Sequence, residues 1–444
     1  MITKELNELG EIIRKIRKEK GLRLEDLADE NISPATISNI ERGVPHVSSD
    51  KSMYLLEKMG LDLKDLPNLI AQQNSELKKD LLKLQHIESL LDLGDPEEGK
   101  HHLDKLHLEG SPYEATYEYL KGKYFIRTKD WKKAERSFFN AIRLYNQYPH
   151  GNIEACSFGE LGLCSYYQNN IEQALRYTES EIAAFVEGQG REYSQYVALC
   201  NKAVYLEKLG RYEEAIQVVN ELWEDIPKIE SAAIVVNLHE LRADLLRKAR
   251  LYEKAITFAK QGIEIARVNK LHDRAFDLWT SLGNIYFIDT EQWEEAGICY
   301  QMALSLRNRF QSHHNHHVFV SAYTRYACLK MKQQQWRQAE DLLRQAIQLG
   351  EKLDSALRLT YAYTAMGDCK KEQKQVDEAI SFYQKGLQLA QKHGYKKREY
   401  IILKSLATCY DGRDQKEFQS CLEGMFRAGN TLLREELSYH EDFK

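Results

Sequence analysis

The sequence has few residues that break helices and no pattern that predicts a disulfide or zinc framework. It contains only 7 prolines in 444 residues. Its 8 cysteines are scattered without a C-x-x-C pair, which excludes a zinc knuckle and favours reduced, mostly buried thiols. Packing rather than cross-linking is therefore expected to hold this chain together.

Long apolar runs and a positive charge excess are also absent. No segment approaches the roughly 18 apolar residues of a membrane span, and "MITKELNELGEIIRKIRKEKG" has no apolar core of a secretion signal. We therefore expect a cytoplasmic protein with no membrane partner. The formal net charge of -5 excludes attraction to nucleic acid through overall charge, so any DNA contact must be local.

Enzyme motifs are missing as well. No P-loop, G-x-S-x-G, H-E-x-x-H or dinucleotide-binding fingerprint occurs. The one conspicuous group of metal-ligand residues is "HHNHH", with His313, His314, His316 and His317. Because no Cys or carboxylate nearby completes a metal site, we interpret this group as a solvated loop. The sequence thus predicts neither an enzyme nor a protein with a cofactor or metal.

Helix-forming residues are abundant. Ala, Leu, Glu, Lys and Gln fill most of the length, with 43% hydrophobic and 29% charged residues overall. This composition favours helices with polar outer faces over strands. Since 444 residues exceed one hydrophobic core, we predict an all-α fold with a small domain followed by an extended array.

Residues 1–69 predict a helix-turn-helix domain. A second helix is expected in "LEDLADE", followed by a tight turn and a third helix in "ISPATISNIERG". In the third helix Ser33 occupies the N-cap position, Pro34 the first helical position, and Gly43 the end. Short helices joined in this way place the third helix in the major groove of DNA.

The third helix turns Ile37 and Ile40 inward, so small and polar side chains face outward. Thr and Ser can bond phosphates or base edges, and Asn can pair with adenine. A basic cluster before the second helix can hold phosphates. A domain that only packs is the alternative, which the slight excess of acidic residues favours. The predicted DNA-binding residues are Arg14, Arg17, Lys18, Arg23, Ser33, Pro34, Ala35, Thr36, Ser38, Asn39 and Arg42.

The segment "GLRLEDLADENISPATISNIERG" resembles the Cro/C1-type helix-turn-helix, whose recognition helix typically ends I-S-x-I-E-x-G. Two departures stand out. Arg23 and Leu24 replace the usual Thr-Gln pair, so the phosphate contact often made by that Gln is absent. The turn between the helices is also one residue shorter than the common form and has no Gly.

From Tyr113 onward a small residue is followed about twelve positions later by Ala, in seven copies. This repetition predicts antiparallel helix pairs whose backbones approach closely at the small residues. The pattern resembles the tetratricopeptide repeat (TPR), but its alanines step by 40 to 43 residues, which implies longer helices than the family's usual repeat of about 34 residues. The pairs are Gly122/Ala134, Gly162/Ala174, Ala203/Ala215, Ala243/Ala255, Gly283/Ala296, Ala327/Ala339 and Gly367/Ala379.

Both flanks extend the predicted array. Residues 70–110 are expected to form a linker helix and a degenerate first repeat with Gly99 in the alanine place. Residues 111–444 are expected to form about seven repeats and a C-terminal cap that begins at Ala407. Such helix pairs stack into a right-handed superhelix whose inner face is lined by the first helix of each pair.

That inner face predicts a peptide groove. An extended peptide has unpaired N–H and C=O groups, so its groove needs side-chain amides and charges on the first helices. Asn201 lies two residues before Ala203 and can donate and accept a hydrogen bond at once. For each residue alone, a solvated or helix-to-helix role is the alternative. The predicted peptide-binding residues are Asn201, Asn237, Arg242, Asp244, Asn284 and Arg325.

A helix-turn-helix head on this array resembles the RNPP family of peptide-responsive regulators of Gram-positive bacteria. "CNKAVYLEKLGRYEEAI" is similar to a family segment with a peptide-contacting Asn, which the resemblance places at Asn201. The resemblance implies a cytosolic quorum-sensing transcription regulator. An imported signalling peptide would bind in its TPR groove and change its oligomeric state and DNA binding.

Two further expectations concern partners. A homodimer or higher homo-oligomer is expected, and a dimer would place two third helices about one DNA turn apart on a partly palindromic double-stranded operator. The alternative function follows from the resemblance to Rap-type members of the family. It is an inhibitor whose repeats bind a response regulator of the sporulation phosphorelay, and whose inhibition a peptide relieves.

Overall fold

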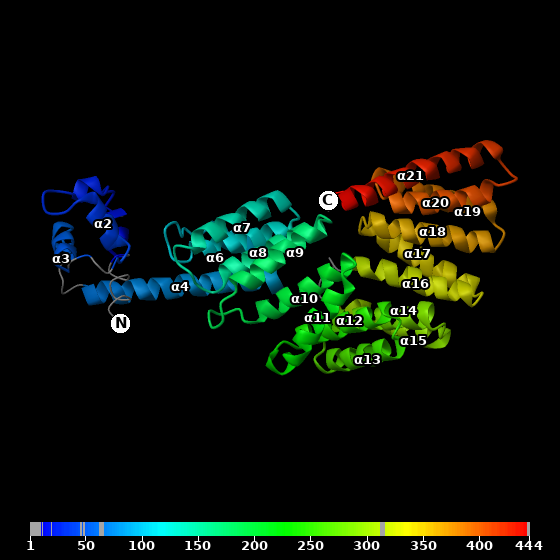
Figure 1. The fold of residues 1–444 in the computed structure, drawn as a ribbon, viewed down its shortest axis with the longest axis horizontal. Coiled ribbons are helices and arrows are strands. Elements are labelled where there is room, and N and C mark those ends of the chain that lie inside the picture. The colour runs from blue at the N-terminus through cyan, green and yellow to red at the C-terminus, as the bar shows by residue number, and fades with distance from the viewer. Residues whose placement is uncertain are drawn as a thin grey trace. The chain divides into compact units, whose positions relative to one another are not determined.

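The computed structural model describes residues 10, 12–18, 20–44, 47, 49–61, 66–310 and 316–441. Across these ranges the regular structure is entirely helical, with no strand, which confirms the predicted all-α fold (Figure 1). The chain divides into two compact units. One comprises residues 1–170 and 183–190, and the other comprises residues 171–182 and 191–444.

The N-terminal head belongs to the first unit and contains short helices. Residues 12–18 are helical, and they are followed by the 3-10 helix η1 (Glu25–Leu27), α2 (Pro34–Glu41) and α3 (Ser49–Lys58). Ile37 and Ile40 face inward, as predicted. They pack in one buried core with Ile13, Leu27, Ile32, Leu55, Leu56 and Met59.

The predicted second helix of the head is reduced to the single turn η1, and the Asp29 side chain explains why. Its Oδ1 accepts hydrogen bonds from the backbone N–H groups of Asn31 and Ile32, at 2.8 and 3.1 Å. Its Oδ2 accepts one from the Tyr54 hydroxyl at 2.7 Å. A carboxylate that binds N–H groups two and three residues ahead stabilises a turn in competition with a helix. The predicted helix was therefore wrong in extent.

The rest of the first unit is built from longer helices. At the closest approach of α4 to α5, a Cβ on Gly99 would lie 3.0 Å from Leu91 Cδ2, so only a very small residue fits there. Asp95 caps α5 by accepting a hydrogen bond from the Glu97 N–H. The helices are α4 (Leu66–Leu93), α5 (Pro96–Asp104), α6 (Glu114–Arg127), α7 (Trp131–Tyr145) and α8 (Ile153–Tyr167).

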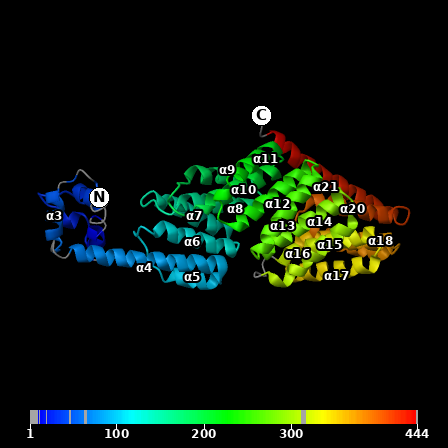
Figure 2. The same cartoon turned by 90° about the horizontal axis from the view of Figure 1, so that it is seen from below.

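The second unit is a row of antiparallel helix pairs. In each pair a first helix is followed by a second helix, and α21 lies along α20 in both views (Figures 1 and 2). The helices are α9 (Ile171–Ala184), α10 (Tyr193–Lys208), α11 (Tyr212–Glu224), η2 (Ile226–Lys228), α12 (Ala232–Lys248), α13 (Tyr252–Val268), α14 (His272–Asn284), the π-helical turn η3 (Ile285–Asp289), α15 (Trp293–Ser305), η4 (Leu306–Arg309), α16 (His317–Lys332), α17 (Trp336–Lys352), α18 (Ala356–Glu372), α19 (Val376–Lys392), α20 (Lys396–Tyr410) and α21 (Gln415–Glu441).

Small residues lie where the two helices of a pair approach most closely. A Cβ on Gly367 of α18 would lie 2.5 Å from Tyr383 Cε1 of α19, closer than real Cβ contacts come. Gly283 faces Tyr300 in the same way, at 3.0 Å. In the first unit, a Cβ on Gly122 would lie 2.5 Å from Phe138 Cε1. The predicted role of the small residues is therefore confirmed at Gly122, Gly283 and Gly367.

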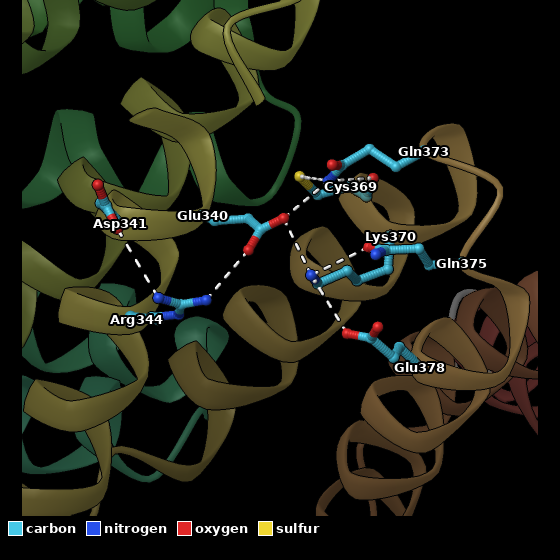
Figure 3. A network of polar contacts seen from close by, with 8 residues as sticks. All are labelled: Glu340, Asp341, Arg344, Cys369, Lys370, Gln373, Gln375 and Glu378. Carbon is cyan, nitrogen blue, oxygen red and sulfur yellow. Dashed lines mark hydrogen bonds and ion pairs between the residues drawn. The ribbon is translucent and has the colours of Figure 1, made fainter. Parts of the chain in front are cut away.

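Ion pairs connect one helix pair to the next, as Figure 3 shows for α17, α18 and α19. Lys370 Nζ lies 3.0 Å from Glu340 Oε1 and 3.2 Å from Glu378 Oε2. It also donates to Gln375 Oε1 at 3.1 Å. Burial lowers the pKa of Lys370, but its hydrogen bonds to the two glutamates outweigh this, so the pKa lies above its usual value. A lysine only 8% exposed is thus fully provided with partners.

Replacing Gly367 with Ala tests the close approach of the helices. The added Cβ would overlap the buried Tyr383 ring, so Gly367→Ala is expected to destabilise the protein by about 1–3 kcal/mol. Gly297→Ala is the matched control, because the nearest atom to its Cβ would be 3.9 Å away and Ala favours a helix by up to about 1 kcal/mol. Thermal unfolding followed by circular dichroism measures both. Equal melting temperatures for the two variants would contradict this packing.

Candidate DNA-binding and ligand-binding surfaces

Helix α2 begins as the sequence predicts. Ser33 is its N-cap, and the Ser33 hydroxyl accepts a hydrogen bond from the Thr36 N–H at 3.1 Å. Pro34 occupies the first helical position, where its missing N–H costs nothing. These features fix the start of α2, so its outward side chains hold constant positions for reading a ligand.

The outward side of α2 is small and polar. Ser33, Ala35 and Arg42 are exposed, and Pro34, Thr36, Ser38 and Asn39 are half-buried. The Arg42 guanidinium donates to Asn39 Oδ1 and to the Ser38 carbonyl, so the three residues form one polar edge at the end of the helix. Such an edge has the donors and acceptors that base edges and phosphates require.

Arg17 is placed differently from the prediction. Its Nε and NH2 donate to the two carboxylate oxygens of Glu41, at 2.6 and 3.0 Å, and its NH1 donates to the Leu22 carbonyl at 2.8 Å. The Arg17 side chain is only 12% exposed and that of Glu41 only 7%. The hydrogen bond to Glu41 raises the pKa of Arg17. Arg17 therefore ties the first helix to α2 instead of facing outward with the phosphate-contacting residues.

The other basic residues of the head lie in two places. Arg23 is exposed beside η1, near the α2 edge in sequence. Arg14 and Lys18 line a cavity of about 420 Å³ together with α4 residues and the segment 107–112. Lys15 pairs there with Glu76 of α4 at 2.6 Å. Of the predicted DNA-binding cations, Arg23 and Arg42 are therefore exposed outside this cavity.

In the second unit, one face is formed by first helices alone. Neighbouring first helices contact each other directly, in the pairs α10/α12, α12/α14, α16/α18 and α18/α20. Residues at equal distances from the small residue share a side of their helices. Asn237, Asp277 and Tyr361 each lie six residues before their small residue, at Ala243, Gly283 and Gly367. We call this side the first-helix face.

A charged cluster lies on the first-helix face between α12 and α14. Arg274 NH1 donates to Asn237 Oδ1 at 3.4 Å. Burial raises the pKa of Glu240, and the neighbouring Asp277 raises it further, whereas Arg274 opposes the shift. Burial also raises the pKa of Asp277. Sequence reasoning missed Glu240, Arg274 and Asp277, although their spacing from Asn237 and Gly283 places them on the same face.

The remaining predicted peptide-binding residues differ in whether their side chains already form hydrogen bonds or ion pairs within the protein. Asn201 is half-buried, and its side chain makes no hydrogen bond within the part of the chain that the structure describes. Asp244 pairs with Arg247 at 3.2 Å. Asn284 Oδ1 accepts the Tyr300 hydroxyl at 2.8 Å, and Arg325 is exposed. Asn201 and Arg325 thus have the most available donors.

Arg242 lies on the other side of α12. Its guanidinium carbon is 4.1 Å from the centre of the Trp223 ring and 4.6 Å from that of Phe258, which belong to the second helices α11 and α13. Arg242 follows Asn237 by five residues, a rotation of about 140° around a helix. The structure therefore does not bring Arg242 together with the other predicted peptide-binding residues, because the helical phase turns it away.

The structure describes only part of the histidine cluster. His313 and His314 lie outside the described residues, while His316 and His317 adjoin the start of α16. The described ranges contain no group of three or more His, Cys, Asp or Glu residues that could hold a metal ion. No helix within those ranges is long and apolar enough to cross a membrane.

The head and the repeats define the class of protein. Residues 13–66 match the helix-turn-helix family model, and residues 196–222 and 318–392 match tetratricopeptide repeat models. The chain is therefore a helix-turn-helix protein with a C-terminal TPR array. A comparison with curated proteins gives no match.

Several solved structures share the architecture. The apo form of the quorum sensor NprR from B. thuringiensis matches with a TM-score of 0.57 and 16% identity, over 80% of this chain and 99% of that one. A Rap protein complexed with Competence and Sporulation Factor matches with a TM-score of 0.51 and 13% identity, over 78% of this chain and 99% of that one. A signal transduction ATPase (STAND protein) with a TPR sensor, from Pyrococcus horikoshii, matches with a TM-score of 0.54 and 15% identity, over 98% of this chain and 65% of that one. These likenesses establish the fold.

The Glu240 carboxyl predicts a pH dependence of stability. Because its pKa is higher in the folded than in the unfolded chain, the folded state resists its ionisation, and stability is lost as pH rises above about 4.3, the ordinary value. Glu240→Gln removes this cost. The variant is expected to gain about 1–3 kcal/mol over the wild type at pH near 7.5, and little at pH near 4.5.

Melting temperatures across this pH range provide the measurement. The control is Glu253→Gln, which alters an exposed carboxylate on α13. A gain for Glu240→Gln that is equal at both pH values, or that the control reproduces, would show that burial of Glu240 does not produce the effect.

Proposed function

We propose that the protein is a DNA-binding transcription regulator of the RNPP type, controlled by a short signalling peptide. The observation behind this proposal is that one chain combines two surfaces lined by polar side chains. The outward edge of α2 presents Ser38, Asn39 and Arg42, and the first-helix face presents Asn201 and Asn237. The fold shared with the quorum sensor NprR supports the proposal.

The α2 edge suits sequence-specific DNA. Asn39 can pair with an adenine edge, and Arg23 and Arg42 can hold the flanking phosphates. One short helix makes few contacts, so useful affinity requires two copies at a fixed separation. We infer a homodimer that places two α2 helices about one DNA turn apart on a partly palindromic operator.

The first-helix face suits an extended peptide. A bound peptide in extended form needs partners for both its N–H and its C=O groups, and a side-chain amide supplies both. Asn201 and Asn237 lie on the neighbouring first helices α10 and α12. A peptide that contacts several first helices favours one arrangement of the array, and so changes the spacing or assembly of the heads.

DNA selection from a random duplex pool tests the first half of the proposal. The full-length protein is expected to protect two half-sites in footprinting. Asn39→Ala should weaken specific binding by about 1–3 kcal/mol because a base edge loses its partner. Asn146→Ala, at the exposed end of α7, is the control. Equal affinities for both variants would remove Asn39 from the interface. Capture of a response regulator without any DNA binding would support the Rap-type alternative instead.

Peptide binding tests the second half. The full-length protein is incubated with a pool of random synthetic peptides of about six to eight residues, and the retained peptides are identified and resynthesised. Asn201→Ala is expected to weaken the binding of the tightest-binding peptide by about 1–3 kcal/mol, measured by calorimetry, because a buried peptide group loses its partner. Asn269→Ala, at the exposed end of α13, is the control. Unchanged affinity in Asn201→Ala would place the peptide elsewhere.

A further inference from the structure

A pocket at the C-terminal end of the second unit is positively charged. It has a volume of about 400 Å³ and lies between α18, α20 and α21. Its walls include the cations Lys396, Lys397 and Arg398 and the apolar side chains of Leu357, Tyr361 and Ile401, and no Asp or Glu is among its described lining residues. The pocket therefore suits a ligand that is both anionic and partly apolar.

Arg398 is the most buried cation of this pocket, at 8% exposure. Its guanidinium carbon lies 3.8 Å from the centre of the Tyr361 ring. Its NH2 donates to Thr364 Oγ1 at 2.8 Å and, more weakly, to the Thr360 carbonyl at 3.4 Å. Its Nε is buried and has no hydrogen-bond partner among the described residues. Ring stacking and the threonine thus fix the guanidinium plane, while the Nε donor is left without a partner among the described residues.

Arg398 also lacks a counter-ion. No carboxylate in the described part of the chain lies within ion-pair distance of it. Asp368 acts on it only through space, since that carboxylate accepts the Tyr383 hydroxyl at 2.6 Å. Lys396 is neutralised by Glu399 at 2.9 Å, whereas Lys397 is exposed. Burial lowers the pKa of Arg398, in agreement with a charge that has lost water without gaining a partner.

Lys370, in the same array, shows the opposite arrangement. Lys370 is equally buried, at 8% exposure, but lies between Glu340 and Glu378 (Figure 3). An unpaired buried charge is costly, so a protein that keeps one without a counter-ion gains when a ligand supplies it. Arg398 is such a charge.

The pocket lies on the face proposed for the peptide. Tyr361 and Ile401 each lie six residues before their small residue, Gly367 and Ala407, as Asn237 does before Ala243. Arg398 lies nine residues before Ala407, as Arg274 does before Gly283. Arg398 therefore borders the first-helix face in the same register as an arginine that contacts Asn237.

We propose that the Arg398 pocket binds a carboxylate of the signalling peptide. A guanidinium donates charge-assisted hydrogen bonds to a carboxylate, and the Nε of Arg398 is a donor without a partner among the described residues. The residue that bears the carboxylate packs its apolar part on Leu357 and Ile401. This inference rests on the proposed peptide-receptor function, and it assigns the anionic group of the ligand to one arginine.

Four matched pools of random synthetic peptides test it with the full-length protein. The pools carry a C-terminal carboxylate or a C-terminal amide, each with or without Asp and Glu, and retained peptides are quantified by mass spectrometry. The wild type is expected to retain peptides with a carboxylate about tenfold better than peptides without one. A difference between acid and amide assigns the terminus, and a difference due to Asp and Glu assigns a side chain.

Variants separate this pocket from general charge effects. Arg398→Gln should abolish the preference for carboxylates while leaving carboxylate-free peptides bound. Arg337→Gln, on the exposed side of α17, should keep the preference. Circular dichroism checks folding. If Arg398→Gln unfolds, Arg398→Lys and Lys397→Gln replace it, and each is expected to reduce the preference several-fold.

The outcomes are distinct. A wild type that binds all four pools alike, or a folded Arg398 variant that keeps the full preference, overturns the carboxylate assignment but leaves the peptide receptor standing. A wild type that retains no peptide from any pool overturns the proposed function, and the assignment with it.

Discussion

The contact that sets the helix spacing in three of the helix pairs is the approach of an aromatic ring to a glycine backbone. Tyr383 lies against Gly367, Tyr300 against Gly283 and, in the first unit, Phe138 against Gly122. Each ring fills the space that a Cβ would need, so the two helices of a pair keep one separation and one rotation. Because interiors pack densely, even one added methyl group disturbs this geometry. The same register then recurs from pair to pair.

The same register determines which charged side chains have partners within the fold and which do not. The buried Lys370 lies between two glutamates, and the half-buried Arg242 lies between the Trp223 and Phe258 rings. On the first-helix face, Asp277 adds to burial in raising the pKa of Glu240, and Arg398 stacks on Tyr361 without a counter-ion among the described residues. A charged group that is buried without a partner costs free energy, and a ligand that supplies the partner removes that cost. This face is therefore the best candidate for the peptide.

Local signals were visible in the sequence, whereas long-range partners were not. The Ser33 cap, the Pro34 start and the small residues at Gly283 and Gly367 follow from short spacings, and the structure confirms them. The pairing of Arg17 with Glu41 joins residues 24 apart, and no spacing rule shows it. Asp29 shortened a helix that the apolar pattern favoured.

The candidate ligand site was predicted only in part, because its side chains, like the Arg17 pairing, depend on contacts between distant residues. The helices that bear it were identified from the repeats, but Arg242 was predicted because it lies close in sequence to the first-helix sites, and the helical phase turns it to the opposite side. Counting back from the small residues would have identified Glu240, Asp277 and Arg398 instead. Their burial and their lack of partners depend on neighbouring repeats, which a single sequence does not show.

The central claim is that the peptide site and the DNA site are coupled through the array. The most direct measurement is the affinity of the full-length protein for its selected duplex, with and without a saturating peptide from the random pool. The account predicts a change in affinity of about fivefold or more, in either direction, and an equal change in peptide affinity caused by the duplex. Binding of both ligands with no effect of either on the other would contradict it.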